Sequence, residues 1–290
     1  MGEGACRLAV DIGGTFTDVV LWSAEGQTTA KVLTTAQAPE QGVLTAVHQV
    51  LNKTGRLLSD VSLMIHGTTL ATNALIERKG AITAFLTSDG FRDILEMGYE
   101  KRFAHYDLNA ARAAPLVPRS LRYTVPERMT ADGRVQVPLD QGAVREVARS
   151  LESAGVEAIA VGFIHAYAYV RHEQMAAEIL QAELPGVRIC LSSDVCPEMR
   201  EYERFSTTCA NAYVQPLMAG YLDRLSNLLI HEGLHSPLYL MMSGGGLTTL
   251  DQAVRYPVRL IESGPAGGAL MSARLASARR LDNVLSFDMG

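Results

Sequence analysis

The chain has 290 residues, of which 48% are hydrophobic, so it can fold as one large domain or as two domains of ordinary size. Its 26 basic and 31 acidic side chains give a net charge of −5, and no basic run is interleaved with aromatic residues, so we expect no nucleic-acid partner. No apolar stretch approaches the roughly 20 residues that cross a bilayer, and the first residues do not resemble a signal peptide, so we expect a cytoplasmic protein without a membrane segment.

The first elements are predicted to be three strands in a meander. Apolar alternation favours strands at 7–12, 16–23 and 28–34, which are separated by glycine-containing turns. A helix is expected to follow, because Pro39 suits a helix start and Gly55 lies just after the last apolar residue of helical spacing.

The next segment is predicted to be a βαβ unit. An apolar strand at 61–66 precedes a helical pattern at 67–80, and a second strand is expected at 81–87. Between 98 and 140 the pattern weakens and prolines recur, so we expect an irregular or antiparallel excursion there.

Helices and strands alternate through the rest of the chain. This alternation favours an α/β fold with a mostly parallel sheet covered on both faces. The expected helices are 141–154, 172–184, 198–232, 249–254 and 264–278, and the expected strands are 157–163, 187–191, 238–242, 258–262 and 283–288.

The most informative motif is the strand–turn–strand segment at 9–22, AVDIGGTFTDVVLW. A buried strand ends near Asp11, and the two glycines that follow allow main-chain N–H groups to approach an anion. A carboxylate at the mouth of such a turn can hold Mg²⁺ through water, and the next strand carries a second carboxylate, Asp18. The alternative is an ordinary hairpin with a Gly-Gly turn. The predicted phosphate-binding residues are Gly13, Gly14, Thr15 and Thr17.

The same pattern of an apolar strand followed by aspartate and glycine recurs at 284–290, VLSFDMG. Two such turns, one in each lobe, resemble the nucleotide clamp of the actin, sugar-kinase and heat-shock ATPase superfamily. The small residues at 262–276 resemble the crossing helix of those proteins, although a plain helix start rich in small residues is the alternative. The resemblance implies that Asp288 shares the metal with Asp11 and that Gly290 contacts phosphate.

Six separated blocks together resemble one family, that of hydantoinase A, N-methylhydantoinase and 5-oxoprolinase, to which acetone and acetophenone carboxylase subunits are related. The blocks are 11–22, 65–81, 87–98, 197–216, 241–246 and 262–268. The resemblance implies an actin-like (ribonuclease H-like) ATPase lobe with an inserted α/β subdomain. It also implies a division into the family's N-terminal region at 1–196 and the start of its second domain at 197–290. Because the family continues with Gly-Thr-Thr and a second lobe, we expect a truncated product or partial record that is inactive alone.

The resemblance further implies an ATP- and Mg²⁺-dependent hydrolase that opens a cyclic amide such as a hydantoin, an N-methylhydantoin or 5-oxoproline. ATP would activate the substrate by phosphoryl transfer, for which a protein mainly positions phosphates and neutralises charge. A hydantoinase B-type subunit or domain is the expected partner. The alternatives are a subunit of an acetone- or acetophenone-type carboxylase and a non-catalytic interaction lobe.

Two polar groups are candidates for substrate or interlobe contacts. The first lies where a strand meets a helix start, a natural site for an anion or polar substrate, but helix capping is the alternative. The second opens the long helix, where a solvated charged face is the alternative. The candidates are His66, Thr68, Thr69 and Asn73 in the first group and Glu201 and Arg204 in the second.

Residues 231–235, His-Glu-Gly-Leu-His, match the HExxH pattern of zinc peptidases. That motif binds zinc only if His231 and His235 lie one turn apart on a continuous helix. Gly233 and Pro237 fall where the preceding helix is expected to end, so we favour a helix terminus over a zinc peptidase.

Overall fold

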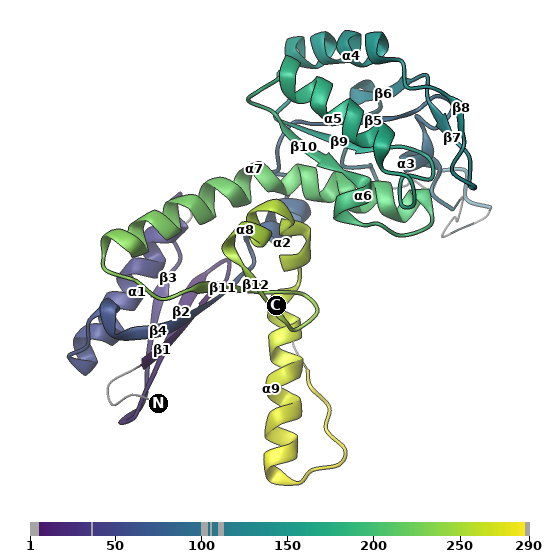
Figure 1. Ribbon diagram of the computed structural model, residues 1–290. Coiled ribbons are helices and arrows are strands. Elements are labelled where there is room, and N and C mark those ends of the chain that lie inside the picture. Colours follow the sequence, from purple (N-terminus) through teal and green to yellow (C-terminus); the bar gives the residue numbers. More distant parts are fainter. Residues whose placement is uncertain (1–5, 36, 100–103, 105, 110–112, 288–290) are drawn as a thin grey trace. The chain divides into compact units, whose positions relative to one another are not determined.

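The computed structural model describes residues 6–35, 37–99, 104, 106–109 and 113–287 (Figure 1). The chain forms two compact units: unit 1 comprises Met1–Lys79 and Leu217–Gly290, and unit 2 comprises Gly80–Pro216. The division proposed from the sequence at 196/197 concerns family regions and remains a proposal. Among the described residues, none of the helices has the length and apolar character needed to span a bilayer.

Unit 1 is built on a six-stranded mixed sheet with the order β12-β11-β4-β1-β2-β3. β1, β2 and β3 form the antiparallel meander expected from the sequence, whereas β4 pairs in parallel with β1, and β11 pairs in parallel with β4. The strands are β1 (Cys6–Ile12), β2 (Phe16–Ser23), β3 (Gly26–Leu33), β4 (Val61–Thr68), β11 (Leu238–Met241) and β12 (Leu247–Thr249).

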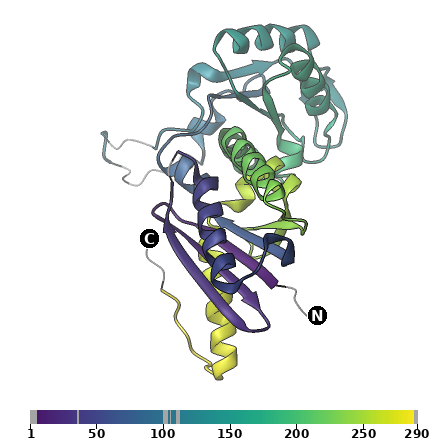
Figure 2. The same cartoon turned by 90° about the vertical axis from the view of Figure 1, so that its left-hand side faces the viewer.

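One face of this sheet is covered by α1 (Pro39–Thr54), which lies along the strands in Figure 2. Alternate residues of β1, such as Leu8 and Val10, are buried toward that side, and the helix buries Val43 and Val47. Gly55 ends the helix in the left-handed conformation that the sequence predicted for a C-terminal glycine. The residues between these buried positions point to the other face of the sheet. That face is largely open, and Trp22 on it is 46% exposed.

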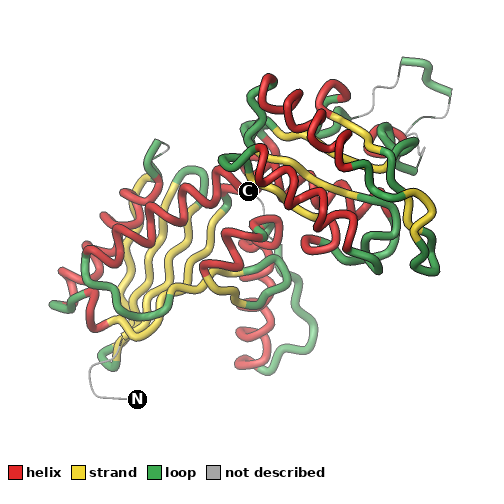
Figure 3. The backbone as a smooth tube through the Cα atoms, turned by 45° about the horizontal axis from the view of Figure 1, so that its top comes forward, coloured by secondary structure: helices red, strands yellow, loops and turns green. Residues whose placement is uncertain are grey.

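Unit 2 contains a four-stranded parallel sheet with the order β10-β9-β5-β6 (Figure 3). Helices α4 and α5 cover one face, where they share the main apolar core, and the first part of α7 packs on the other through Phe205, whose ring lies 5.3 Å from that of Phe85. The elements are β5 (Thr83–Ser88), β6 (Arg122–Val125), β9 (Ala158–Gly162), β10 (Arg188–Leu191), α4 (Gln141–Ser153), α5 (Arg171–Glu183) and α7 (Glu201–His231).

The remaining elements are short, apart from α9. Helix α9 exposes about half of each of Leu270, Met271 and Leu275. The remaining elements are α2 (Leu70–Ile76), α3 (Ile94–Met97), β7 (Arg128–Met129), β8 (Val135–Val137), α6 (Ser192–Val195), α8 (Leu250–Arg255), α9 (Ser263–Arg279) and the 3-10 turns Leu58–Asp60, Arg119–Leu121 and Pro257–Leu260.

Several sequence predictions of the fold were wrong. The expected βαβ unit does not exist, because β4 pairs within the sheet of unit 1 and β5 within that of unit 2. The mostly parallel sheet that was expected is found in unit 2, whose strands all pair in parallel, whereas unit 1 has antiparallel strands at both edges. Local periodicity reports the presence of a strand but not the sheet that it joins.

Two expected strands near the end of the described chain are absent. Residues 258–260 lie in the 3-10 turn Pro257–Leu260, which begins at Pro257 because the fixed φ of a proline suits the first position of a helical turn. At 283–288, the described residues 283–287 form no strand, and position 288 lies outside the described residues. The excursion at 98–140 is partly antiparallel through β7 and β8, but β6 pairs in parallel with β5.

Candidate functional site

The turn between β1 and β2 is closed by its own backbone. The N–H of Gly13 donates to the carbonyl of Phe16 at 2.9 Å, and a Cβ atom on Gly13 would lie 3.2 Å from that carbonyl oxygen. The carbonyl of Thr15 accepts from the N–H of Thr34 at 2.9 Å, which joins the turn to the end of β3. The turn is therefore held in one conformation by main-chain contacts.

Gly14 and Thr15 are exposed at the tip of this turn. Within the part of the chain that the structure describes, their main-chain N–H groups have no acceptor. Successive main-chain N–H groups in a tight turn form a concavity that suits an anion. The tip can thus accept phosphate oxygens without breaking a hydrogen bond of the described protein.

Thr17, predicted as a phosphate contact, lies inside the protein. Its side chain is fully buried and its hydroxyl lies 3.1 Å from that of Thr34, which donates to the carbonyl of Gly13 at 2.9 Å. Thr17 therefore stabilises the turn from the buried side, through the hydroxyl of Thr34. Sequence reasoning missed this role of Thr34, which it took as the last residue of the expected strand at 28–34, whereas β3 ends at Leu33.

Asp11 lies on the open face of the sheet, directly opposite Asp18 on β2. Partial burial of its carboxyl group raises the pKa of Asp11, and the nearby charge of Asp18 raises it further, whereas Lys31 opposes the shift. Asp18 accepts a 2.6 Å contact from Lys31 Nζ. The two carboxylates and one ammonium therefore share a small area beside the turn.

Gly67 on β4 keeps space for Asp11. The two residues are paired in register, and a Cβ atom at position 67 would lie 2.7 Å from Asp11 Oδ1. Any larger residue there would push the carboxyl group away from the sheet. Sequence reasoning missed this role, because a close approach between strands cannot be read from one strand.

His66 is completely buried, so it does not face a ligand in unit 1. Burial lowers its pKa to about 4, so the ring is neutral near pH 7. Nδ1 lies 3.4 Å from the carbonyl oxygen of Val10, and Nε2 lies 2.8 Å from the hydroxyl of Tyr221. Because a carbonyl only accepts, the proton is assigned to Nδ1, and Nε2 accepts from Tyr221.

The junction of β4 and α2 is fastened to the turn through Thr69 and Asn73. Both the N–H and the hydroxyl of Thr69 donate to the carbonyl of Ile12 at 3.1 Å, and the amide of Asn73 donates to the Thr69 hydroxyl at 3.3 Å. The hydroxyl of Thr68 accepts from the N–H of Leu70 at 3.2 Å, whereas the N-cap residue of α2, Thr69, makes no side-chain capping hydrogen bond. A Cβ atom at Gly14 would lie 3.5 Å from the Asn73 amide nitrogen, so Asn73 borders the tip of the turn.

Glu201 and Arg204 belong to unit 2, where Arg204 is fully buried. Its guanidinium donates to the Ser192 hydroxyl at 3.1 Å and to the carbonyls of Glu198 and Phe163 at 2.8 and 3.1 Å. Burial opposes ionisation of Glu201, but Arg204 at 3.3 Å holds the pKa of Glu201 below its ordinary value. Arg204 is therefore engaged by the protein itself.

The carboxyl ends of the unit 2 strands, where ligands of open α/β sheets usually bind, are filled by the protein's own polar groups. The buried carboxylate of Glu173 accepts from the N–H groups of Phe163 and Ser193, each at 2.9 Å, and from the Ser192 hydroxyl at 2.6 Å. Burial raises the pKa of Glu173 despite these bonds. Two buried atoms at this edge, Thr87 Oγ1 and His165 Nδ1, nevertheless have no hydrogen-bond partner among the described residues.

The remaining predicted residues do not extend the site. Asp288 and Gly290 lie outside the described residues. Helix α7 ends at His231, and Gly233 has φ 98°, so His231 and His235 do not lie on successive turns of one helix. Over the described ranges, no group of three or more His, Cys, Asp or Glu side chains is arranged to hold a metal ion.

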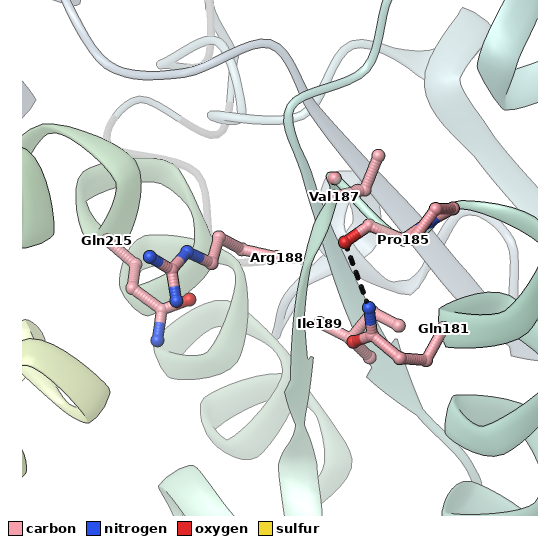
Figure 4. A pocket seen from close by; sticks show the side chains of 7 residues that line it. Gln181, Pro185, Val187, Arg188, Ile189 and Gln215 are labelled. Atoms are coloured by element: carbon pink, nitrogen blue, oxygen red, sulfur yellow. Dashed lines mark hydrogen bonds between the residues drawn. The ribbon is translucent and has the colours of Figure 1, made fainter.

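Unit 2 also has a cavity of about 360 Å³ beside the start of β10 (Figure 4). The side chains of Arg188 and Gln215 lie next to each other there, and Gln181 donates to the carbonyl of Pro185 at 3.2 Å. None of the residues predicted from the sequence lines this cavity.

The chain is similar to known proteins along nearly its whole length. A sequence model described as the hydantoinase/oxoprolinase N-terminal region matches residues 7–184, and one described as hydantoinase/oxoprolinase matches residues 204–290. Caprolactamase subunit alpha from Pseudomonas jessenii is 35% identical over 100% of this chain and 43% of its own length. The 5-oxoprolinase of Saccharomyces cerevisiae is 30% identical over 100% of this chain and 25% of its own. The chain thus spans less than half of these relatives.

Solved structures agree with the sequence comparison. ATP-dependent caprolactamase from Pseudomonas jessenii superposes with a TM-score of 0.88 and 34% identity, over 98% of this chain and 42% of that chain. Nucleotide-free acetone carboxylase superposes with a TM-score of 0.87 and 26% identity, over 95% and 41%. These matches confirm the α/β fold of actin-like ATPases that was expected from the sequence. The chain belongs to the hydantoinase/oxoprolinase family.

Proposed function

We propose that the chain forms the phosphate-binding part of an ATP-dependent enzyme that opens a cyclic amide such as a hydantoin, an N-methylhydantoin or 5-oxoproline. The observation that carries the proposal is the turn tip. There the main-chain amides of Gly14 and Thr15 have no acceptor among the described residues, and the carboxylate of Asp11 lies near the turn. The named activities of the caprolactamase and 5-oxoprolinase relatives support the choice of a cyclic amide.

The residues present suit ATP and Mg²⁺. Mg²⁺ is usually held by one or two carboxylates together with phosphates and water, and Asp11 and Asp18 supply two carboxylates on one face. The turn amides would orient the phosphates. When bound, Mg-ATP supplies the phosphoryl group that activates the amide oxygen of the substrate. In this scheme the protein mainly positions groups and balances charge.

The other predicted residues take supporting parts in this proposal. Asn73 borders the turn tip and is placed to contact a phosphate or the substrate. His66, Thr68 and Thr69 hold the strands beneath it. Asp288, as a further metal ligand, Gly290, as a phosphate contact, and Glu201 and Arg204, as substrate contacts, remain predictions.

A subunit of an acetone-type carboxylase is the second candidate, favoured by the TM-score of 0.87 with acetone carboxylase. The relatives include a subunit alpha and a subunit gamma, so we propose that this chain also acts with a partner, of the hydantoinase B type. To separate the two reactions, ADP release should be measured with the partner present, either with 5-oxoproline, hydantoin and caprolactam or with acetone and bicarbonate.

The nucleotide site is tested with Asp11→Asn, which keeps the shape of the side chain but removes its charge. We expect the affinity for Mg-ATP, measured by calorimetry, to fall at least about tenfold, because a charge-assisted contact of this kind contributes about 1.5–3 kcal/mol. Asp132→Asn, at an exposed residue of unit 2, is the matched control and should bind normally. Undiminished binding by the Asp11 variant would refute the proposed site.

A further inference from the structure

Four paired residues cross the sheet of unit 1 in a row beside the turn. Lys31 on β3 is opposite Asp18 on β2, Asp18 is opposite Asp11 on β1, and Asp11 is level with Gly67 on β4. Residues directly opposite each other in a sheet project to the same face. Asp11 and Lys31 are exposed and Asp18 is partly exposed, so this face is the open one.

The row combines two carboxylates with one cation. Like charges directly opposite each other on adjacent strands destabilise a sheet, so Asp11 and Asp18 need a counter-charge. Lys31 Nζ provides it, at 2.6 Å from Asp18 Oδ2 and 4.8 Å from the centre of the Phe16 ring. The side chains of Lys31 and Asp18 are 56% and 45% exposed, so the contact can open without unpacking the core.

The ammonium group also lies on the side from which a metal would arrive. Phe16, the first residue of β2, directly follows the turn whose amides are proposed to contact the phosphates, and Lys31 lies over its ring. A dication held by the two carboxylates would therefore lie within a few ångströms of a positive charge. The two cations would compete for the same oxygens.

We propose that Lys31 is the resident counter-cation of the metal site, so that free Mg²⁺ binds weakly and the metal enters together with its nucleotide. This inference rests on the proposed function, because it assumes that Asp11 and Asp18 face a metal. Lys31 thus acts as a positioning residue that sets metal affinity. Phosphates that arrive with Mg²⁺ supply the negative charge that offsets the repulsion by Lys31.

The experiment measures Mg²⁺ binding to the 290-residue chain by calorimetry, first without nucleotide and then in the presence of a non-hydrolysable ATP analogue. Lys31→Met removes the charge and keeps an unbranched side chain, and Lys31→Arg keeps the charge. Lys53→Met is the matched control, because Lys53 is an exposed lysine on α1 whose ammonium group donates to the carbonyl of Thr29 and not to a carboxylate of the row. Circular dichroism establishes that each variant is folded, and Lys31→Gln replaces Lys31→Met if that variant is not.

Without nucleotide, we expect Lys31→Met to bind Mg²⁺ on the order of three- to tenfold more tightly than the parent, from the repulsion of a nearby unit charge in a solvated setting. Lys31→Arg and Lys53→Met should match the parent. With the nucleotide analogue, the gain of Lys31→Met should shrink.

Two results would overturn the inference while leaving the proposed function intact. Unchanged Mg²⁺ affinity in Lys31→Met would show that Lys31 does not compete with the metal. Weaker nucleotide binding with unchanged Mg²⁺ affinity would show that Lys31 contacts phosphate instead. If the parent chain binds neither Mg²⁺ nor the nucleotide analogue, the proposed function itself fails.

Discussion

At the scale of single residues, the site depends on small groups that leave room for a charged one. Gly14 presents its main-chain amide at the turn tip, and Gly67 leaves the space in which the Asp11 carboxyl group lies. Neither glycine has positive φ, so backbone conformation does not require a glycine at either position, and at Gly67 the requirement is one of space. Substitution at Gly67 should therefore change the position of a side chain more than the stability of the fold.

Gly67→Ala tests this role. The added methyl group would lie 2.7 Å from Asp11 Oδ1, so the carboxyl group must rotate away from the proposed metal position. We expect the affinity for Mg-ATP, measured by calorimetry, to fall about tenfold, while the free energy of unfolding changes by less than about 1 kcal/mol.

Gly186→Ala serves as the control, because its added methyl group would meet nothing within 4 Å. Equal Mg-ATP affinity in the Gly67 variant and the parent would mean that the position of the Asp11 carboxyl group is unimportant.

The residues that sequence reasoning missed show what a single strand does not reveal. The sequence predicted the turn and Asp11, because a Gly-Gly pair after an apolar strand is a local signal. Lys31, Thr34 and Gly67 act across strands, and their positions follow from a register that the pattern of each strand does not contain. Cross-strand partners therefore required the structure.

At the scale of elements, long periodic segments were predicted well. The expected helix at 198–232 is α7, which begins at Glu201 and ends at His231, because its many buried apolar residues outweigh Pro216 within it. The expected strand at 258–262 was wrong, since a five-residue apolar pattern is also compatible with a 3-10 turn that begins at a proline. Short segments are decided by tertiary partners rather than by their own sequence.

His66 joins two elements, because it lies on β4 and accepts a hydrogen bond from Tyr221 on α7. Its pKa falls from 6.5 to about 4 on folding because burial disfavours the charged ring. When the pH falls below 6.5, the His66 imidazole becomes protonated in the unfolded chain, but in the folded chain it stays neutral down to about pH 4. The contribution of neutral His66 to the free energy of unfolding is therefore complete above pH 6.5 and is lost as the pH falls from 6.5 to about 4.

We predict that protonation of His66 lowers the free energy of unfolding by roughly 2–3 kcal/mol as the pH falls through this range. Urea denaturation at several pH values measures it, and His66→Gln should remove this part of the slope despite its lower stability. His231→Gln, at a side chain that is 87% exposed, should keep the parental slope. A slope that persists in the His66 variant would assign the pH dependence to other groups.

At the scale of the whole molecule, most large apolar side chains of the described chain are buried, but those of helix α9 are about half exposed. Unit 1 and unit 2 each bury their own apolar residues, whereas α9 exposes apolar side chains along its length. Leu270, Met271 and Leu275 are 51%, 51% and 52% exposed, and the segment after α9 leaves Phe287 82% exposed. An apolar helix without cover is a typical site of association.

We therefore expect the chain to bind a hydrophobic dye and to self-associate through α9. The triple variant Leu270→Gln, Met271→Gln, Leu275→Gln should lower dye fluorescence and the apparent mass in sedimentation, because it removes most of the apolar surface of the helix. Its Mg-ATP affinity should remain that of the parent, because the three residues belong to α9 and not to the turn or to the carboxylate pair Asp11 and Asp18. Leu57→Gln, which removes an isolated leucine that is 67% exposed, is the control for a general loss of surface leucine. If the triple variant binds dye as strongly as the parent does, the association surface must instead lie on the open face of the sheet around Trp22.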